Sequence, residues 1–281
     1  MRSPGYEARS ARRFPNSGPL ATMVLRQPTS YPHINHLLRD LTSGLEAVFE
    51  NRLVGVYLYG SLVTGDYDDG VSDVDLLAVL RHDIDEHDLV PLDMLHRRLI
   101  DDHPEWNDRI EVAYLSLAAL RTFRSRTSRI GIISPGEPLH FRQAGRDWLM
   151  NWYLVRDRGM TLVGPPPQEI IPPVSVEEFI ASVLDHAQSW HLPEEINVKP
   201  QSYVILTMCR TLYTVRFRAH VSKLQAATWV AETLPEWAPL IRDAMRWRIG
   251  QPAREEDSNN IVSRTHRFVE VVKQQLVVRR E

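Results

Sequence analysis

The sequence has little cysteine and no long apolar run. Its single cysteine, Cys209, excludes a disulfide framework, and chains without disulfides are typical of reducing compartments. No segment approaches the roughly 20 consecutive apolar residues that a membrane-spanning helix needs. These absences predict a cytoplasmic protein with no membrane partner.

An excess of positive charge is also missing. The 33 Lys and Arg residues are outnumbered by 36 Asp and Glu, which gives a formal net charge of −3. Proteins that hold long nucleic acids usually carry a basic face, so extended nucleic acid is not an expected partner. No group of Cys and His residues has the spacing of a zinc site. With 43% hydrophobic and 25% charged residues, the chain has the composition of an ordinary globular protein.

Composition and periodicity divide the chain into four parts. Residues 1–29 mix Arg, Ser, Pro and Gly without an apolar period, which predicts a disordered tail in which Met23 is an alternative translation start. Residues 30–164 combine helical and strand patterns, and residues 165–175 form a proline-rich linker. Residues 176–281 show helical periodicity throughout. We expect an α/β domain followed by an all-α helical bundle.

Three short segments predict strands. β-Branched and aromatic residues favour strands at residues 53–59 and 74–80, which are joined by the turn-forming sequence GDYDDGVS. Residues 109–115 alternate cleanly and predict a third strand, with Glu111 on its less apolar face. Apolar residues at helical spacing predict amphipathic helices before the first strand and again from about residue 86 to 102.

The segment YGSLVTGDYDDGVSDVDLLAVL, residues 59–80, carries the clearest chemical signal. Asp73 and Asp75 are two residues apart, so on a strand both carboxylates point to the same side and repel each other unless a cation lies between them. Mg²⁺ prefers such oxygen ligands, and Glu111 would complete the site. Gly60 lets the backbone approach a phosphate closely, and Ser61 can donate to its oxygens. Alone, each piece is more often simple turn chemistry; their order favours metal-assisted attack on a nucleotide phosphate.

The same segment resembles the Gly-Ser and Asp-x-Asp signature of the polymerase β-like nucleotidyltransferase superfamily. The pieces RIEVAYL, GMTLVGPPPQEII, VILTMCRTLYTVRF and SKLQAATWVAETLPE extend the resemblance, over residues 25–272, to the streptomycin/spectinomycin 3″(9)-O-adenylyltransferases. The resemblance implies an α/β (α+β) nucleotidyltransferase domain with a mixed sheet that holds MgATP, and a helical domain that closes the cleft.

The resemblance also assigns roles to particular residues. Asp73 and Asp75 match the metal-binding aspartates, and Gly60 with Ser61 matches the turn that holds the triphosphate. Glu111 matches the general base, although a third metal ligand is the alternative role. Two cations of the helical domain match residues that reach the phosphates, namely Arg210 and Lys223. ATP and Mg²⁺ are therefore the expected co-substrate and cofactor.

The acceptor is less well defined. In the drug-modifying members, aspartates lie just before the helix that carries the residue matched by Arg210. This chain has Lys199 and Pro200 there, with Glu194 and Glu195 upstream. Residues 125–152 also match poorly, and we assign Trp148 and Trp152 within them to packing. The expected activity is transfer of AMP to a hydroxyl of a small acceptor, as in streptomycin or spectinomycin, by a monomer. A protein or RNA hydroxyl and a non-catalytic nucleotide-binding module are the alternatives.

Overall fold

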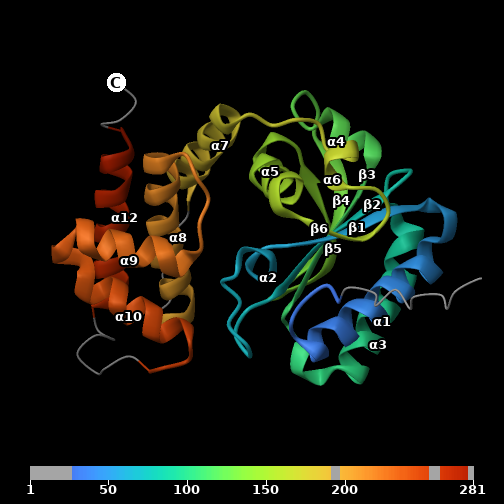
Figure 1. Cartoon of the computed structure of the whole chain (residues 1–281), viewed down its shortest axis with the longest axis horizontal. Coiled ribbons are helices and arrows are strands. Elements are labelled where there is room, and N and C mark those ends of the chain that lie inside the picture. The colour runs from blue at the N-terminus through green and yellow to red at the C-terminus, as the bar shows by residue number, and fades with distance from the viewer. Residues whose placement is uncertain (1–26, 191–196, 253–259, 278–281) are drawn as a thin grey trace, which may run out of the picture.

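The structure is a computed structural model that describes residues 27–190, 197–252 and 260–277 (Figure 1). An α/β half is followed by a helical half that lies beside it, which confirms the expected fold class. Nearly all of the predicted tail, Met23 included, lies outside the described residues, as do Glu194 and Glu195. No helix among the described residues has both the length and the apolar character that crossing a membrane requires.

The described strands form one six-stranded mixed sheet in the order β5-β4-β3-β2-β1-β6. β1 pairs antiparallel with β2 and β6, and β2 pairs parallel with β3. β4 and β5 form an antiparallel hairpin that extends the sheet from β3. The strand bounds are β1 Leu53–Tyr59, β2 Val74–Leu80, β3 Ile110–Ser116, β4 Ser128–Ser134, β5 Glu137–Ala144 and β6 Met160–Val163.

The two faces of the sheet are covered by different helices. Helices α1 (Pro32–Phe49) and α3 (Glu86–Asp102) bury their apolar stripes against alternate residues of β1, β2 and β3. Helix α5 (Leu149–Arg158) and one side of α7 (Val176–Ser189) pack with the other set of strand residues. Because successive strand residues point to opposite faces, each strand contributes to both cores. The short helices α2 (Ser61–Thr64) and α4 (Leu117–Thr122) follow β1 and β3.

The stretch that fits the family poorly forms the β4–β5 hairpin and the start of α5. Trp148 and Trp152 stack with ring centroids 5.5 Å apart, and both are buried in the core shared by the sheet, α5 and α7. The packing role expected for these two residues is confirmed. The sequence does not predict this hairpin, because its polar, exposed edge strand β5 has a weak apolar alternation.

The helical half has its own core. It is built from one side of α7 together with α8 (Val198–Phe217), α9 (Lys223–Thr233), α10 (Ala238–Arg248) and α12 (Ile261–Val277). Within the predicted linker, a short helix α6 (Pro167–Ile170) places Ile170 and Ile171 in the core of the α/β half. Since α7 contributes to both cores, the linker bounds at residues 165 and 175 stay a prediction.

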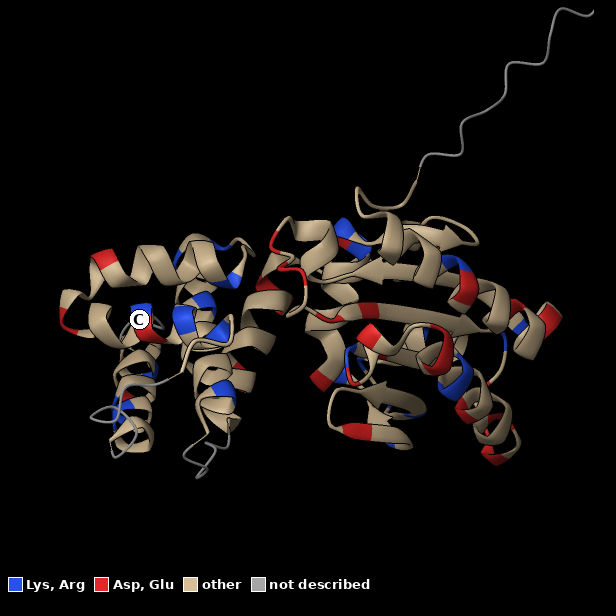
Figure 2. Cartoon of the chain, turned by 90° about the horizontal axis from the view of Figure 1, so that it is seen from below, with Lys and Arg blue, Asp and Glu red and all other residues tan. Residues whose placement is uncertain are grey.

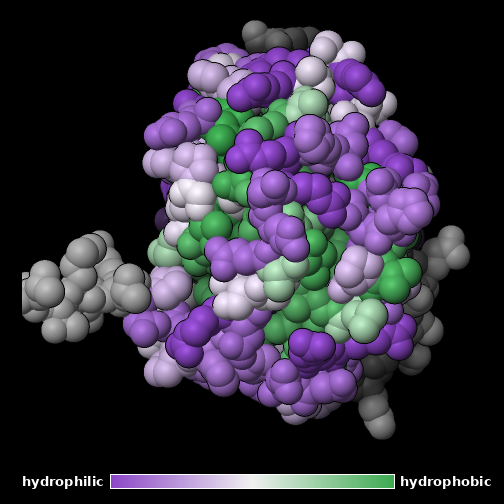
Figure 3. Space-filling model, turned by 90° about the vertical axis from the view of Figure 1, so that its right-hand side faces the viewer, coloured by the Kyte–Doolittle hydropathy of each residue, from purple (hydrophilic) through white to green (hydrophobic). Residues whose placement is uncertain are grey.

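The end of the α/β half that lies away from the helical half is largely hydrophilic, with apolar areas between the polar side chains (Figure 3). The acids expected from the sequence do not lie there. Asp75 and Glu111 lie near the starts of β2 and β3, at the ends of the strands that turn toward the helical half (Figure 1).

Candidate active site

Strand register brings three polar side chains together on one face of the sheet. Tyr59 at the end of β1 is opposite Asp75 on β2, and Asp75 is opposite Glu111 on β3. These residues share the strand face of Leu77 and Ala113, which is the face turned away from α1 and α3. Asp73 lies one residue before β2 begins, so it belongs to the preceding loop rather than to the strand that the sequence suggested.

A glycine is required where the loop after β1 meets Asp75. Gly60 has φ 72°, a conformation that side chains rarely adopt, and a Cβ there would lie 1.8 Å from Oδ2 of Asp75. Ser61 begins α2 directly afterwards. The predicted Gly-Ser turn is therefore packed against the predicted metal-binding aspartate.

Burial and mutual repulsion disfavour the charged forms of these acids. Burial raises the pKa of Asp75 well above its usual range, and the charges of Glu111 and Asp73 raise it further. Burial likewise raises the pKa of Glu111 and of Asp73. A site that forces carboxylates together at this cost is typical of a functional centre that a cation completes.

A buried tyrosine fixes Glu111. The Tyr59 hydroxyl donates a hydrogen bond to Oε1 of Glu111 at 3.1 Å, and this bond works against burial by lowering the pKa of Glu111. Burial and the two neighbouring carboxylates raise the pKa of Tyr59 itself, so it remains a donor. Tyr59 is not among the site residues predicted from the sequence, although its place at the end of β1, directly before Gly60, is a signal.

Cations of the helical half face the acids. In Figure 2, basic segments of the helical half lie toward the α/β half. The charges of Lys223 and Arg210 both act to lower the pKa of Asp75. Burial, together with the charges of Arg210 and Arg248, lowers the pKa of Lys223 to about 7. The Lys223 ammonium lies 3.8 Å from the centroid of the Tyr203 ring. The structure thus brings all seven residues predicted from the sequence to one region.

A third cation, Arg248 at the end of α10, was not found from the sequence. Its Nε donates to Oδ2 of Asp68 at 2.8 Å, and one of its terminal nitrogens donates to the Ser72 hydroxyl at 3.2 Å. The backbone N–H of Lys223 donates to Asp66 at 3.0 Å. These contacts tie the loop before β2 to the helical half, about 180 residues further along the chain, a separation that no local sequence pattern reports.

Lys199, on the first turn of α8, is exposed and electrostatically close to Asp73. Arg109, whose side chain donates to the Ser72 carbonyl at 2.7 Å, acts on the same carboxylate. The region therefore contains more cations than the pair expected from the sequence. Such a concentration of positive charge next to paired carboxylates suits a ligand that brings phosphates and a divalent ion together.

Comparison with known proteins finds related domains in both halves of the chain. Residues 44–133 match the model of the nucleotidyltransferase domain, and residues 169–275 match that of the aminoglycoside adenylyltransferase C-terminal domain. The two matches lie in order along the chain, so both of its halves resemble the aminoglycoside adenylyltransferases. Its α/β half is accordingly the nucleotidyltransferase domain of an enzyme.

Relatives of this family span most of the chain. An Escherichia coli aminoglycoside (3″)(9) adenylyltransferase is 27% identical over 245 residues, which cover 84% of this chain and 90% of the relative. A Klebsiella pneumoniae protein of the same name is 26% identical over 227 residues, covering 77% and 86%. The spectinomycin adenyltransferase AAD(9) from Enterococcus faecialis, solved with ATP and spectinomycin, has the same fold, with a TM-score of 0.71 at 19% identity. That match covers 86% of this chain and 98% of the solved one.

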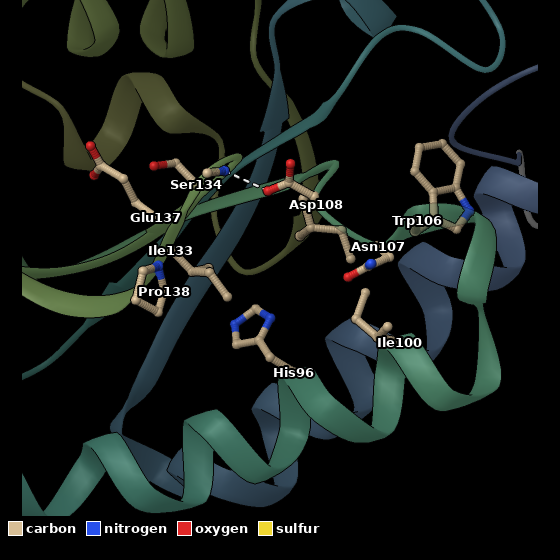
Figure 4. Close-up of a pocket in the computed structure, with 11 residues that line it drawn as sticks. His96, Ile100, Trp106, Asn107, Asp108, Ile133, Ser134, Glu137 and Pro138 are labelled. Carbon is tan, nitrogen blue, oxygen red and sulfur yellow. Dashed lines mark hydrogen bonds between the residues drawn. The ribbon is translucent and has the colours of Figure 1, made fainter.

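A hollow of about 340 Å³ lies elsewhere in the chain, between α3 and the β4–β5 hairpin (Figure 4). Its floor includes His96, whose Nε2 lies 2.6 Å from the Tyr114 hydroxyl, and burial lowers the pKa of His96 to about 4. The hollow is lined by strand residues such as Ile110 and Ile133 rather than by the acids or cations described above. It is therefore separate from the candidate active site.

Proposed function

We propose that the protein is a Mg²⁺-dependent adenylyltransferase that moves AMP from ATP to a hydroxyl of an aminoglycoside or aminocyclitol antibiotic. The observation that carries the proposal is the placement of Asp73, Asp75 and Glu111 at one end of the sheet, opposite Arg210 and Lys223 of the helical half. Acids that hold a metal and activate a hydroxyl, facing cations that hold phosphates, are the two requirements of this reaction.

The residues fit a divalent ion. Asp73 and Asp75 would be its ligands. Their carboxyl groups have raised pKa values, and a nearby cation would stabilise the ionised forms and lower these pKa values. Mg²⁺ bound there would supply positive charge to the phosphate oxygens during transfer. Glu111 remains next to this pair, with one oxygen held by Tyr59.

Glu111 is the proposed general base. With Oε1 accepting from Tyr59, its other oxygen is available to take the proton from the acceptor hydroxyl as that hydroxyl attacks the α-phosphorus of ATP. The new oxygen–phosphorus bond forms as the bond to the bridging oxygen breaks, and pyrophosphate leaves. A raised pKa suits a base that must gain a proton during the reaction and lose it afterward.

The cations hold the triphosphate. Gly60 and Ser61 present backbone and hydroxyl donors at the start of α2, while Arg210 and Lys223 approach from α8 and α9. Their charge would offset the negative charge that develops on the departing pyrophosphate. Because these groups sit on separate halves, the full set is assembled only when the halves are together, as they are in this structure.

The acceptor class follows the relatives. Those from E. coli and K. pneumoniae are named for aminoglycoside adenylylation, and the E. faecialis neighbour was solved with spectinomycin. Lys199 adds positive charge near Asp73 and would disfavour a polycationic drug. Spectinomycin, with fewer cationic groups than streptomycin, is therefore the better fit to this chain.

The test is pyrophosphate release from MgATP in the presence of streptomycin, spectinomycin or no acceptor. We expect release that depends on a drug, fastest with spectinomycin, and that is lost in Glu111→Ala. Glu105→Ala is the matched control, because Glu105 is exposed and lies outside the site. ATP binding without release in the presence of either drug would refute the acceptor proposed here and direct the search to a protein or RNA hydroxyl.

A further inference from the structure

We propose that His36, Asp40 and His103 form a binding site for a divalent transition-metal ion of the Zn²⁺ class. His36 and Asp40 lie on α1, and His103 is the cap residue that directly follows α3. One ligand atom from each lies within 4.8 Å of the other two. This cluster is independent of the proposed catalytic acids, because α1 and α3 cover the opposite face of the sheet.

The distances suit a shared metal ion. Nε2 of His103 lies 2.8 Å from Oδ2 of Asp40, and Nε2 of His36 lies 3.4 Å from the same oxygen. Ligands about 2.0–2.2 Å from a tetrahedral Zn²⁺ ion are separated from each other by roughly 3.3 Å. Both imidazoles therefore direct Nε2 toward the same carboxylate oxygen. The two nitrogen–oxygen distances are close to the separation between two ligand atoms of one tetrahedral ion.

Local structure explains why these groups converge. His36 and Asp40 are four residues apart on α1, so they lie on the same face of the helix one turn apart. His103 caps the C-terminus of α3, and its backbone N–H donates to the Leu99 carbonyl at 2.8 Å. The packing of α1 against α3 then places the His103 ring 5.0 Å from the His36 ring, at an interplanar angle of 80°.

Burial differs across the cluster in a way that suits a metal with an open coordination position. The His103 side chain is only 6% exposed, whereas Asp40 and His36 are 39% and 61% exposed. One ligand is thus fixed by packing, and the other two border solvent, from which an ion can enter. Three protein ligands leave the fourth position of a tetrahedral ion to water.

The ligand chemistry separates this site from the active-site acids. Imidazole nitrogen with one carboxylate suits Zn²⁺, Co²⁺ or Ni²⁺, whereas clustered carboxylates suit Mg²⁺. An ion bound at the cluster would join α1 to the end of α3, two helices that together cover one face of the sheet. We expect it to stabilise the α/β half without taking part in adenylyl transfer.

The experiment is a Zn²⁺ titration of the full-length, untagged protein in excess Mg²⁺, followed by calorimetry and by the thermal unfolding midpoint. We expect about one tight Zn²⁺ per chain and a midpoint that rises with Zn²⁺. His36→Ala should weaken binding at least about tenfold and remove the rise. Because His36 is largely exposed, its replacement should leave the fold intact.

Three further variants locate the ion. Asp40→Asn should weaken binding as His36→Ala does, while His87→Ala, an exposed histidine of α3 outside the cluster, should behave like the parent. Asp75→Asn should also bind Zn²⁺ like the parent. Loss of binding in Asp75→Asn with retention in His36→Ala would place the ion at the active-site acids and overturn the proposal. Absence of saturable Zn²⁺ binding by the parent would overturn it as well.

Discussion

The two sides of the candidate active site carry opposite charges. On the sheet, Asp75 and Glu111 have pKa values raised by burial and by each other's charge. On the helices, Lys223 and Arg210 have pKa values lowered by burial, with like charges nearby adding to the effect on Lys223. Each half concentrates charge at a cost to its own stability. The difference teaches that the two halves are matched to a ligand that carries both signs, as a metal-bound triphosphate does.

Removing a charge from the acidic side should have the largest effect on activity. Asp75→Asn should lower kcat about a thousandfold, since metal-based stabilisation of transition-state charge contributes several kcal/mol. The folded state should be at least as stable as the parent at pH 7, because the folded pKa of Asp75 is raised and its ionised form therefore opposes folding. Steady-state turnover and urea unfolding measure the two effects.

Asp101→Asn is the control for that experiment, since Asp101 is an exposed carboxylate on α3. Turnover of Asp75→Asn at the parent's rate would show that the metal ligands are wrongly assigned. A large loss of stability would show instead that Asp75 has a structural role.

The link between the two sides is tested next. Arg248→Ala removes the hydrogen bonds to Asp68 and Ser72 that tie the loop before β2 to α10. Hydrogen bonds to charged groups contribute about 1.5–3 kcal/mol, so kcat/KM for ATP should fall roughly ten- to a hundredfold. Arg242→Ala, an exposed arginine on the same helix, should match the parent. Equal activity of the two variants would mean that this contact does not hold the active arrangement.

Proton linkage tests the role of Lys223 on the basic side. Lys223 has a folded pKa of about 7 against an ordinary value of 10.5, so between these values the unfolded state holds more protons. Its charged form therefore opposes folding below pH 7, and that penalty declines as the pH rises from 7 toward 10.5. A bound triphosphate favours the charged form, so ATP binding near pH 8.5 should draw up to about one proton onto Lys223.

Calorimetry of ATP binding in buffers with different ionisation enthalpies measures that uptake. Lys223→Met should take up fewer protons than the parent, by up to about one. Comparing the two proteins removes the contribution of the acids, whose protons are released when a metal binds. Identical uptake by both would place the triphosphate away from Lys223.

The smallest expected effect concerns the bond between Tyr59 and Glu111. This bond lowers the pKa of Glu111, so Tyr59→Phe should raise it and leave less of the base deprotonated at a given pH. The acid limb of the kcat/KM profile should shift to higher pH, with less than about a tenfold loss at pH 7. A limb that does not move would show that Glu111 is not the titrating base.

Much of the α/β half could be predicted from sequence because its signals are local. Apolar spacing gave α3 with the bounds that the structure shows, and alternation gave β3 within one residue. β1 and β2 have the predicted bounds, residues 53–59 and 74–80, so Asp73 lies just before β2 and not on the strand with Asp75 as the Asp-x-Asp pattern suggests. The β4–β5 hairpin gave no clear pattern, since β5 is exposed along much of its length.

The sequence by itself determined the helices and strands with clear periodicity, the Gly-Ser turn after β1 and the identity of the acids, because each depends on neighbours within a few residues. Only the tertiary structure decided the register that places Glu111 beside Asp75, the contact of Arg248 with the loop before β2, and the meeting of His103 with α1. His36, Asp40 and His103 have no zinc-site spacing along the chain. Groups so far apart meet through the packing of whole helices and strands, and no local spacing encodes that packing.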